Sequence, residues 1–287
     1  MPDHRFSRPH SQAISPSEAL ENPETSLQTI AQTSIHTLPA CASALFSEAS
    51  KPSNSFAHID SLSAEQRASL EHYCELVQRY QASMNLISPK ALEQLPQRIS
   101  ESYCYAVMLQ HITQQDTDLI AELATATANA ENSNPGLQGL DLGSGVGLPA
   151  IALLVALPQY RWLLVERRSK RASFLRIVLA QLSNLPTNYA TVVSEDVRQI
   201  NSPHWPAVHI ISAQAVGRLA ELYALTRHLH AAHIVLLSRK GRDWPEEVAE
   251  LQARTGAALQ VYQQALARDG TLIGVSLRGG LPCPLSV

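Results

Sequence analysis

The sequence predicts an α/β fold, in which a sheet of seven strands alternates with helices and a small helical subdomain precedes the sheet. Three observations lead to this prediction. Short apolar runs alternate with helical patterns from residue 137 onward, which is typical of mostly parallel sheets. The last two apolar runs follow each other without a long helical pattern, so they should form an antiparallel pair. Hydrophobic residues make up 45% of the 287 residues, enough for a sizeable core.

The first 112 residues divide into two segments of different character. Residues 1–57 are rich in Ser, Pro, Thr, Gln and Ala and show no apolar period, which predicts a disordered tail. Residues 60–112 carry helical patterns and form the expected helical cap subdomain. Its first helix begins after Ser63, where S-A-E-Q is a capping box, and its second begins at Ser88-Pro89. A third helix follows Pro96.

The rest of the chain consists of a connector and the sheet domain. Residues 113–136 are polar and rich in alanine, and we expect the end of a helix followed by a surface connector. Residues 137–287 form the predicted sheet domain. Its expected strands are 137–142, 161–166, 189–194, 208–212, 233–238, 258–264 and 271–277, and its expected helices are 149–157, 170–182, 219–229 and 244–254.

Charge and cysteine usage exclude several classes of protein. A formal charge of -3 gives no global preference for nucleic acid or anionic membranes, so a basic surface would have to be local. The four cysteines lie far apart, which excludes a zinc site and indicates reduced thiols. The longest apolar run, 148–157, is shorter than the roughly 20 residues of a membrane helix. No apolar segment follows the N-terminal arginines, so we expect a cytoplasmic, monomeric protein without metal.

A glycine-rich turn follows the first predicted strand. In LDLGSGVGLP, three glycines lie where a doubly wound sheet binds nucleotides, because glycine permits a tight turn and close approach of the backbone. Glu166 ends the next strand, where a carboxylate can accept hydrogen bonds from ribose hydroxyls. Asp196 and Val197 follow the third strand, where they can meet an adenine amino group and cover its ring. The candidate adenosine-binding residues are Asp141, Gly143, Gly145, Gly147, Leu148, Glu166, Asp196, Val197, Arg198 and Gln214.

The pattern of the glycines distinguishes between adenosine cofactors. NAD-binding folds use G-x-G-x-x-G, and Leu148 occupies the position of the last glycine. A nucleotide-dependent oxidoreductase is therefore the disfavoured alternative. With Asp141, the sequence D-x-G-x-G resembles motif I of class I S-adenosylmethionine-dependent methyltransferases, which have a Rossmann-like sheet of seven strands ending in an antiparallel pair.

Four stretches of the chain resemble a narrower family, RsmG (GidB). They are DLGSGVGLPAIALLVALP, WLLVERRSKRASFL, MNLIS at Met84–Ser88 and LLSRKG at Leu236–Gly241, where the family has L-x-L-K-G. The resemblance spans about Ser63 to Leu277. It implies S-adenosyl-L-methionine as cofactor, 16S rRNA or the 30S subunit as partner, and methylation of N7 of one guanine in the 530 loop.

The chain departs from the family pattern at three places. Gln214 replaces an arginine after the fourth strand, and His209 stands where an aspartate is usual. The R-H-x-x-D-S segment reads Q-R-I-S-E-S at residues 97–102, so it lacks the histidine. Arg218 is a candidate to compensate for the lost arginine. An alternative hypothesis is therefore a divergent RNA-binding pseudo-methyltransferase without turnover.

Methylation of guanine N7 uses the lone pair of the base, so we expect catalysis by positioning and no catalytic dyad, with Gln214 the one candidate catalytic position. The segment Arg161–Arg176 carries six basic residues and one acidic residue, a local basic patch. The candidate RNA contacts are Arg98, Lys170, Arg171 and Lys240.

Overall fold

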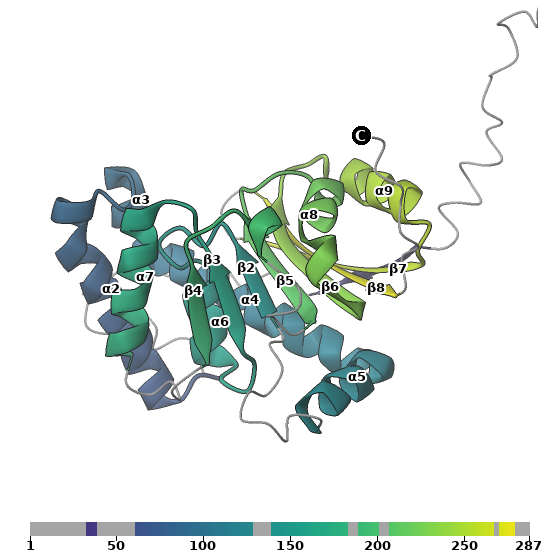
Figure 1. The fold of residues 1–287 in the computed structure, drawn as a ribbon, viewed down its shortest axis with the longest axis horizontal. Helices are drawn as coiled ribbons and strands as arrows, with labels where there is room; N and C mark the ends of the chain where they lie inside the picture. The colour runs from purple at the N-terminus through teal and green to yellow at the C-terminus, as the bar shows by residue number, and fades with distance from the viewer. Residues whose placement is uncertain are drawn as a thin grey trace, which may run out of the picture.

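The computed structural model describes residues 33–38, 61–128, 139–182, 189–200, 207–266 and 270–278, which form an eight-stranded sheet with helices on both faces (Figure 1). Strand β8 runs antiparallel to β6 and β7, and the other neighbouring pairs are parallel. The antiparallel arrangement of the last two strands is thereby confirmed. In sheet order the strands are β1 (Thr33–Thr37), β7 (Leu259–Ala265), β8 (Thr271–Arg278), β6 (His230–Lys240), β5 (Val208–Gln214), β2 (Gly139–Leu142), β3 (Trp162–Val165) and β4 (Ala190–Val193).

The helices begin where the sequence places capping residues. Ser63 caps α2 through the predicted capping box with Gln66, and the Ser88 side chain accepts a hydrogen bond from the backbone N–H of Ala91 in α3. The helices are α2 (Ala64–Met84), α3 (Pro89–Glu93), α4 (Leu95–Gln115), α5 (Thr117–Ala128), α6 (Ala150–Ala156), α7 (Ser169–Gln181), α8 (Leu219–Thr226) and α9 (Trp244–Thr255), with 3-10 turns η3 (Val197–Gln199) and η5 (Arg227–Leu229).

Side-chain alternation along the strands produces two cores. In β3, Trp162 and Leu164 face one side of the sheet and Leu163 and Val165 face the other, because successive strand residues point to opposite faces. The first set packs with residues of α2, α4, α6 and α7, and the second with residues of α8 and α9. The result is a sheet between two helical layers.

An eighth strand corrects two predictions, that the sheet has seven strands and that residues 1–57 form a disordered tail. Thr33–Thr37 lies within the segment predicted to be disordered, yet it forms β1, parallel to the edge strand β7. Its ends are fixed by a hydrogen bond from Thr33 Oγ1 to Gln252 Oε1 at 2.7 Å and by one from the Leu38 backbone N–H to the Gln263 carbonyl at 2.8 Å. The segment has no apolar alternation of its own, and its partner strand lies more than two hundred residues away. The rest of residues 1–57 lies outside the described residues.

The predicted cap subdomain is instead part of one helical layer. Helices α2 and α4 bury their apolar residues in the same core as α6, α7 and the sheet. Gly274 of β8 shows how close this contact is, because a Cβ there would lie 2.8 Å from both Ile112 Cδ1 and Met108 Sδ of α4. The predicted connector 113–136 contains a helix of its own, α5, because Asp116 caps it by accepting a hydrogen bond from the Leu119 backbone N–H. Residues 129–138 lie outside the described residues.

The connection between β4 and β5 holds the short 3-10 turn η3 in its described part. Cys74 is a free thiol as expected, whereas Cys104 is disulfide-bonded, which sequence separation alone did not reveal. No helix in the described ranges is both long and apolar enough to cross a membrane.

Candidate functional site

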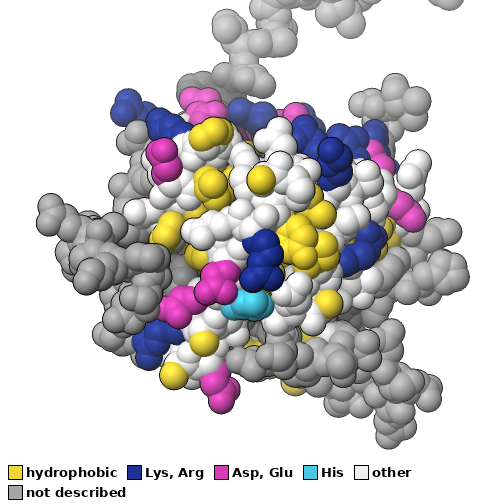
Figure 2. All heavy atoms as spheres, turned by 90° about the vertical axis from the view of Figure 1, so that its left-hand side faces the viewer, with side chains coloured by type: hydrophobic (Ala, Val, Ile, Leu, Met, Phe, Trp, Pro, Cys, Tyr) yellow, Lys and Arg dark blue, Asp and Glu magenta, His cyan; other side chains and the backbone are white. Residues whose placement is uncertain are grey.

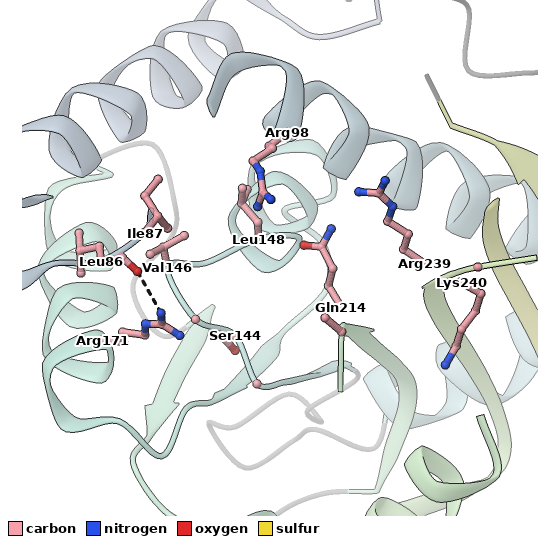
Figure 3. Close-up of a pocket in the computed structure, with 14 residues that line it drawn as sticks. Leu86, Ile87, Arg98, Ser144, Val146, Leu148, Arg171, Gln214, Arg239 and Lys240 are labelled. Carbon is pink, nitrogen blue, oxygen red and sulfur yellow. Dashed lines mark hydrogen bonds between the residues drawn. The ribbon is translucent and has the colours of Figure 1, made fainter. Parts of the chain in front are cut away.

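A cavity lies at the carboxyl ends of the central strands. The chain runs outward in one direction from β2 to β3 and β4, and in the other from β5 to β6, so the strand order reverses between the neighbours β2 and β5. In open α/β sheets ligands bind outside the strand ends at such a switch point. The cavity measures about 520 Å³ and is lined by Leu86, Ile87, Arg98, Gly143, Ser144, Gly145, Val146, Leu148, Arg171, Gln214, Ala215, Arg239, Lys240 and Gly241 (Figure 3).

The glycine turn after β2 forms the floor of this cavity. Gly143, Gly145 and Gly147 have φ angles of +72°, +59° and +110°, the left-handed region that glycine adopts without steric cost. A Cβ on Gly147 would lie 2.5 Å from Ile151 Cγ1, so this glycine is needed for packing. Among the described residues other than its chain neighbours, a Cβ on Gly145 would find one heavy atom within 4 Å, the Gly143 carbonyl oxygen at 3.8 Å. Gly145 therefore presents bare backbone to the cavity, as a cradle for a bound nucleoside requires.

Glu166 is tied directly to the glycine turn. The backbone N–H of Gly145 donates to Glu166 Oε2 at 2.9 Å, and that of Arg168 donates to Oε1 at 2.8 Å. These bonds fix a buried carboxylate beside the turn. Each carboxylate oxygen has more than one lone pair, so the same group can also accept hydrogen bonds from ribose hydroxyls.

Asp141 supports the turn from below and does not line the cavity. Its Oδ1 accepts a hydrogen bond from Ser212 Oγ of β5 at 2.5 Å, which ties the two strands of the switch point together. Burial raises the pKa of Asp141 to about 6, although hydrogen bonds from Ser212 and Ser144 partly oppose this effect. Asp141 is therefore a structural support of the predicted motif, without direct access to a ligand in this structure.

The Met84–Ser88 stretch forms one wall of the cavity. Gln81 of α2 holds it, because Gln81 Oε1 accepts hydrogen bonds from the backbone N–H groups of Leu86 and Ile87, each at 3.0 Å. The Leu86 carbonyl in turn accepts a hydrogen bond from Arg171 Nη2 of α7 at 3.1 Å (Figure 3). Arg171, a predicted RNA contact, is thus positioned at the cavity wall.

Three side chains converge at the opposite end of the cavity. Gln214 comes from the end of β5, Arg98 from α4 and Arg239 from β6, and their polar groups point toward the same space (Figure 3). Gln214 and Arg98 were predicted at the site from the sequence, whereas Arg239 was missed. The alternation of β6 could have revealed it, since Arg239 shares a face with the buried Val235 and Leu237 of the α4 side.

Lys240, the predicted RNA contact on β6, faces away from this space. Its side chain points away from Gln214, Arg98 and Arg239 (Figure 3), and its ammonium pairs with Glu247 of α9 at 2.8 Å and donates to the Gly217 carbonyl. The physical reason is strand alternation, which sends Arg239 and Lys240 to opposite faces of the sheet. The Lys240 ammonium is thus engaged within the protein, although the residue is part of the cavity lining, and its role as an RNA contact stays a prediction.

The predicted adenine-binding residues do not line the cavity. Arg198 donates to both carboxylate oxygens of Asp196, at 2.9 and 2.7 Å, and thereby holds the pKa of Asp196 well below its usual range. The Val197 side chain packs in the core beneath the sheet. Lys170 is exposed on the first turn of α7 and also lies outside the cavity lining.

The face formed by α2, α3 and α7 carries charges of both signs. Lys and Arg side chains gather along its upper rim, with Asp and Glu among them (Figure 2). Within the predicted basic patch, Arg167 pairs with Asp196 at 3.4 Å, and Arg176 donates to the Val192 carbonyl at 3.2 Å. Part of the patch therefore serves contacts within the protein.

Two tyrosines that the sequence did not assign to the site hold its backbone in place. Tyr73 of α2 donates from Oη to the Val146 carbonyl at 2.9 Å, and Tyr105 of α4 accepts from the Arg239 backbone N–H at 3.0 Å. Burial raises the pKa of both phenols, so they stay neutral.

Of the departures from the family pattern, His209 is buried near Glu122, away from the cavity lining. Within the described ranges, no group of three or more His, Cys, Asp or Glu side chains is arranged to hold a metal ion.

Comparisons with known proteins agree on one family. A family model described as GidB, rRNA small subunit methyltransferase G, matches residues 66–267. A curated protein from Bartonella tribocorum named ribosomal RNA small subunit methyltransferase G is 30% identical over 221 residues, covering 76% of this chain and 91% of its own length. Proteins of the same name from Sinorhizobium medicae and Paracoccus denitrificans are 26% and 28% identical, covering 75% and 72% of this chain and 91% and 93% of theirs.

Proposed function

The chain belongs to the rRNA small subunit methyltransferase G family, and from this premise we propose that it transfers a methyl group from S-adenosylmethionine to N7 of guanine 527 in 16S rRNA. The observation that carries the proposal is the glycine turn at the switch point, which faces a cavity with arginines on its other walls. The turn fits a nucleoside cofactor and the arginines fit an anionic polymer.

The residues present fit the cofactor at one end of the cavity. Gly143, Gly145 and Leu148 line the cavity and would hold it against the turn. Glu166 is not among the lining residues, but it accepts a hydrogen bond from the Gly145 backbone and would also accept hydrogen bonds from the ribose of the cofactor. When bound, S-adenosylmethionine supplies an electrophilic methyl group on a sulfonium centre. Adenine contacts from Asp196, Val197 and Arg198 stay predictions, because these residues lie outside the cavity lining.

The chain's own residues act mainly by positioning. Guanine N7 carries an in-plane lone pair, so no side chain has to remove a proton before the methyl group is attacked. The product purine gains positive charge, so orienting hydrogen bonds rather than an acid are needed near the base. Gln214 supplies a neutral amide at the end of the cavity where Arg98 and Arg239 meet. An amide in that place can donate to or accept from a base edge without adding a charge.

The proposal is tested by transfer of labelled methyl groups to 30S subunits from cells that lack this protein, followed by nucleoside analysis. We expect 7-methylguanosine at a single site. Gly145→Val should raise the Kd for S-adenosylhomocysteine at least tenfold while the fold persists, because the added side chain enters the space that Gly145 leaves open. Unchanged cofactor affinity in this variant would contradict the assignment of the turn.

A second candidate function is an RNA-binding pseudo-methyltransferase, favoured by the amide of Gln214 at the cavity end where the family has an arginine. This candidate predicts cofactor and RNA binding without methyl transfer. It also predicts that Gln214→Arg restores turnover. Methyl transfer by the wild-type protein at a rate typical of enzymes would exclude it.

A further inference from the structure

Arg239 directs its charged group into the cavity, whereas the ammonium of its neighbour Lys240 points away from it. The Arg239 side chain is 22% exposed, against 5% for Lys240, whose ammonium is bound by Glu247 and the Gly217 carbonyl. The basic pair that ends β6 therefore has one member committed to the protein interior and one directed to the cavity (Figure 3).

Arg239 is held in a fixed position by its surroundings. Its backbone N–H donates to Tyr105 Oη at 3.0 Å, and its Cα is paired with that of Leu272 in β8. Its Nη1 lies 3.4 Å from Oε2 of the buried Glu101, a long ion pair. A guanidinium presents five N–H donors in a planar fork, a geometry that matches the oxygens of a phosphate.

The position of Arg239 along the sheet edge separates it from the cofactor end. Glu166 follows β3 and the glycine turn follows β2, whereas Gln214 ends β5 and Arg239 lies near the end of β6, on the other side of the switch point. Arg98 approaches the same end from α4 (Figure 3). Arg98 and Arg239 thus bring two guanidinium groups to the lining of this end of the cavity, which suits an anion.

We propose that Arg239, together with Arg98, binds a backbone phosphate of the target RNA at the β5–β6 end of the cavity. This inference rests on the proposed function for the identity of the RNA. The phosphodiester is the anion that an RNA substrate offers beside every base, and Arg forks bind phosphate through paired N–H groups.

The test measures binding of 30S subunits, taken from cells that lack this protein, in the presence of S-adenosylhomocysteine between about 50 and 200 mM KCl. Arg239→Gln should weaken binding roughly tenfold at low salt and reduce the slope of log K against log salt by about one. Arg254→Ala is the matched control, because Arg254 is exposed on α9 and pairs with Glu250. Its slope should equal that of the wild type, and the Kd for S-adenosylhomocysteine should change less than twofold in both variants.

If the slope of log K against log salt for Arg239→Gln equals that of the wild type, the proposal is overturned. The same holds if Arg254→Ala reduces this slope as much as Arg239→Gln does. An unchanged slope with weaker cofactor binding would assign Arg239 to the cofactor's carboxylate instead. If Arg239→Gln unfolds because Glu101 has lost its cation, the double variant Arg239→Gln/Glu101→Gln removes both charges. The salt dependence of its binding to 30S subunits is then measured in the same way. Methyl transfer by the wild-type protein is followed on the same subunits. Its absence counts against the proposed function alone, because the salt slope is read from binding without turnover.

Discussion

Replacing Asp141 by asparagine should change how the stability of the protein depends on pH. Burial raises the pKa of Asp141 from 3.8 to about 6, whereas the same carboxyl titrates near 3.8 in the unfolded chain. Between these values the unfolded state loses the proton and the folded state retains it, so stability falls as pH rises. The full difference between the two pKa values corresponds to about 3 kcal/mol, of which about 2 kcal/mol is lost between pH 4 and pH 7, because the unfolded carboxyl is already more than half ionised at pH 4.

Asparagine removes the charge and keeps an oxygen that can accept the hydrogen bond from Ser212 Oγ. Any cost of fitting its amide N–H₂ group is the same at every pH. The difference in unfolding free energy between Asp141→Asn and wild type should therefore shift by about 2 kcal/mol in favour of the variant from pH 4 to pH 7.

Urea unfolding followed by circular dichroism at pH 4, 5, 6 and 7 gives this difference directly. Glu246→Gln is the control, because Glu246 is an exposed carboxylate on the first turn of α9. A difference between Asp141→Asn and wild type that stays constant over the pH range would refute the reasoning.

Three other perturbations probe the packing around the site. Lys240→Met should cost about 3–5 kcal/mol in urea unfolding, because it leaves the buried carboxylate of Glu247 without its cation, and Lys240→Met/Glu247→Leu should recover most of that loss. Gly147→Ala should lower the unfolding free energy by about 2–4 kcal/mol, since it combines a φ of +110° with a Cβ 2.5 Å from Ile151 Cγ1; a loss below 1 kcal/mol would mean that the turn relaxes. Removal of residues 1–38 takes away β1 and exposes the edge of β7, so light scattering should detect concentration-dependent association, and a monomer at all concentrations would contradict this.

Local signals made most of the fold predictable from the sequence. The capping box at Ser63 and the Ser88-Pro89 start are short-range interactions, and both recur in the structure at the expected residues. The strands from β2 to β8 coincide with apolar runs, which can be read from the local sequence without knowledge of their partner strands. By contrast, β1 depends on pairing with β7, and a five-residue polar segment contains no sign of that distant partner.

The candidate site was predictable where a sequence motif determines the backbone conformation. It was less predictable where packing determines to which face of the sheet a side chain points. The glycine turn and Glu166 meet as the motif implied, because both follow adjacent parallel strands. Which of Arg239 and Lys240 directs its charge to the cavity depends on the face of β6 that each side chain takes, and the sequence analysis named Lys240 but not Arg239. The assignment of Asp196 to the cofactor stays a prediction; in this structure Arg198 donates to its carboxylate, a contact that the sequence analysis did not foresee.

The distribution of arginines bears on whether the cavity still serves catalysis. Gln214 stands at a family arginine position, yet Arg98 and Arg239 point to the same end of the cavity, Arg98 from a family histidine position and Arg239 from an apolar position of L-x-L-K-G. Both guanidinium groups line the cavity, so they supply positive charge at the end that Gln214 leaves neutral. The positive charge of the site has therefore moved rather than disappeared. On this argument Gln214→Arg adds a third cation beside two others, and it should lower methyl transfer through like-charge repulsion. A gain of activity in that variant would instead support the pseudo-methyltransferase.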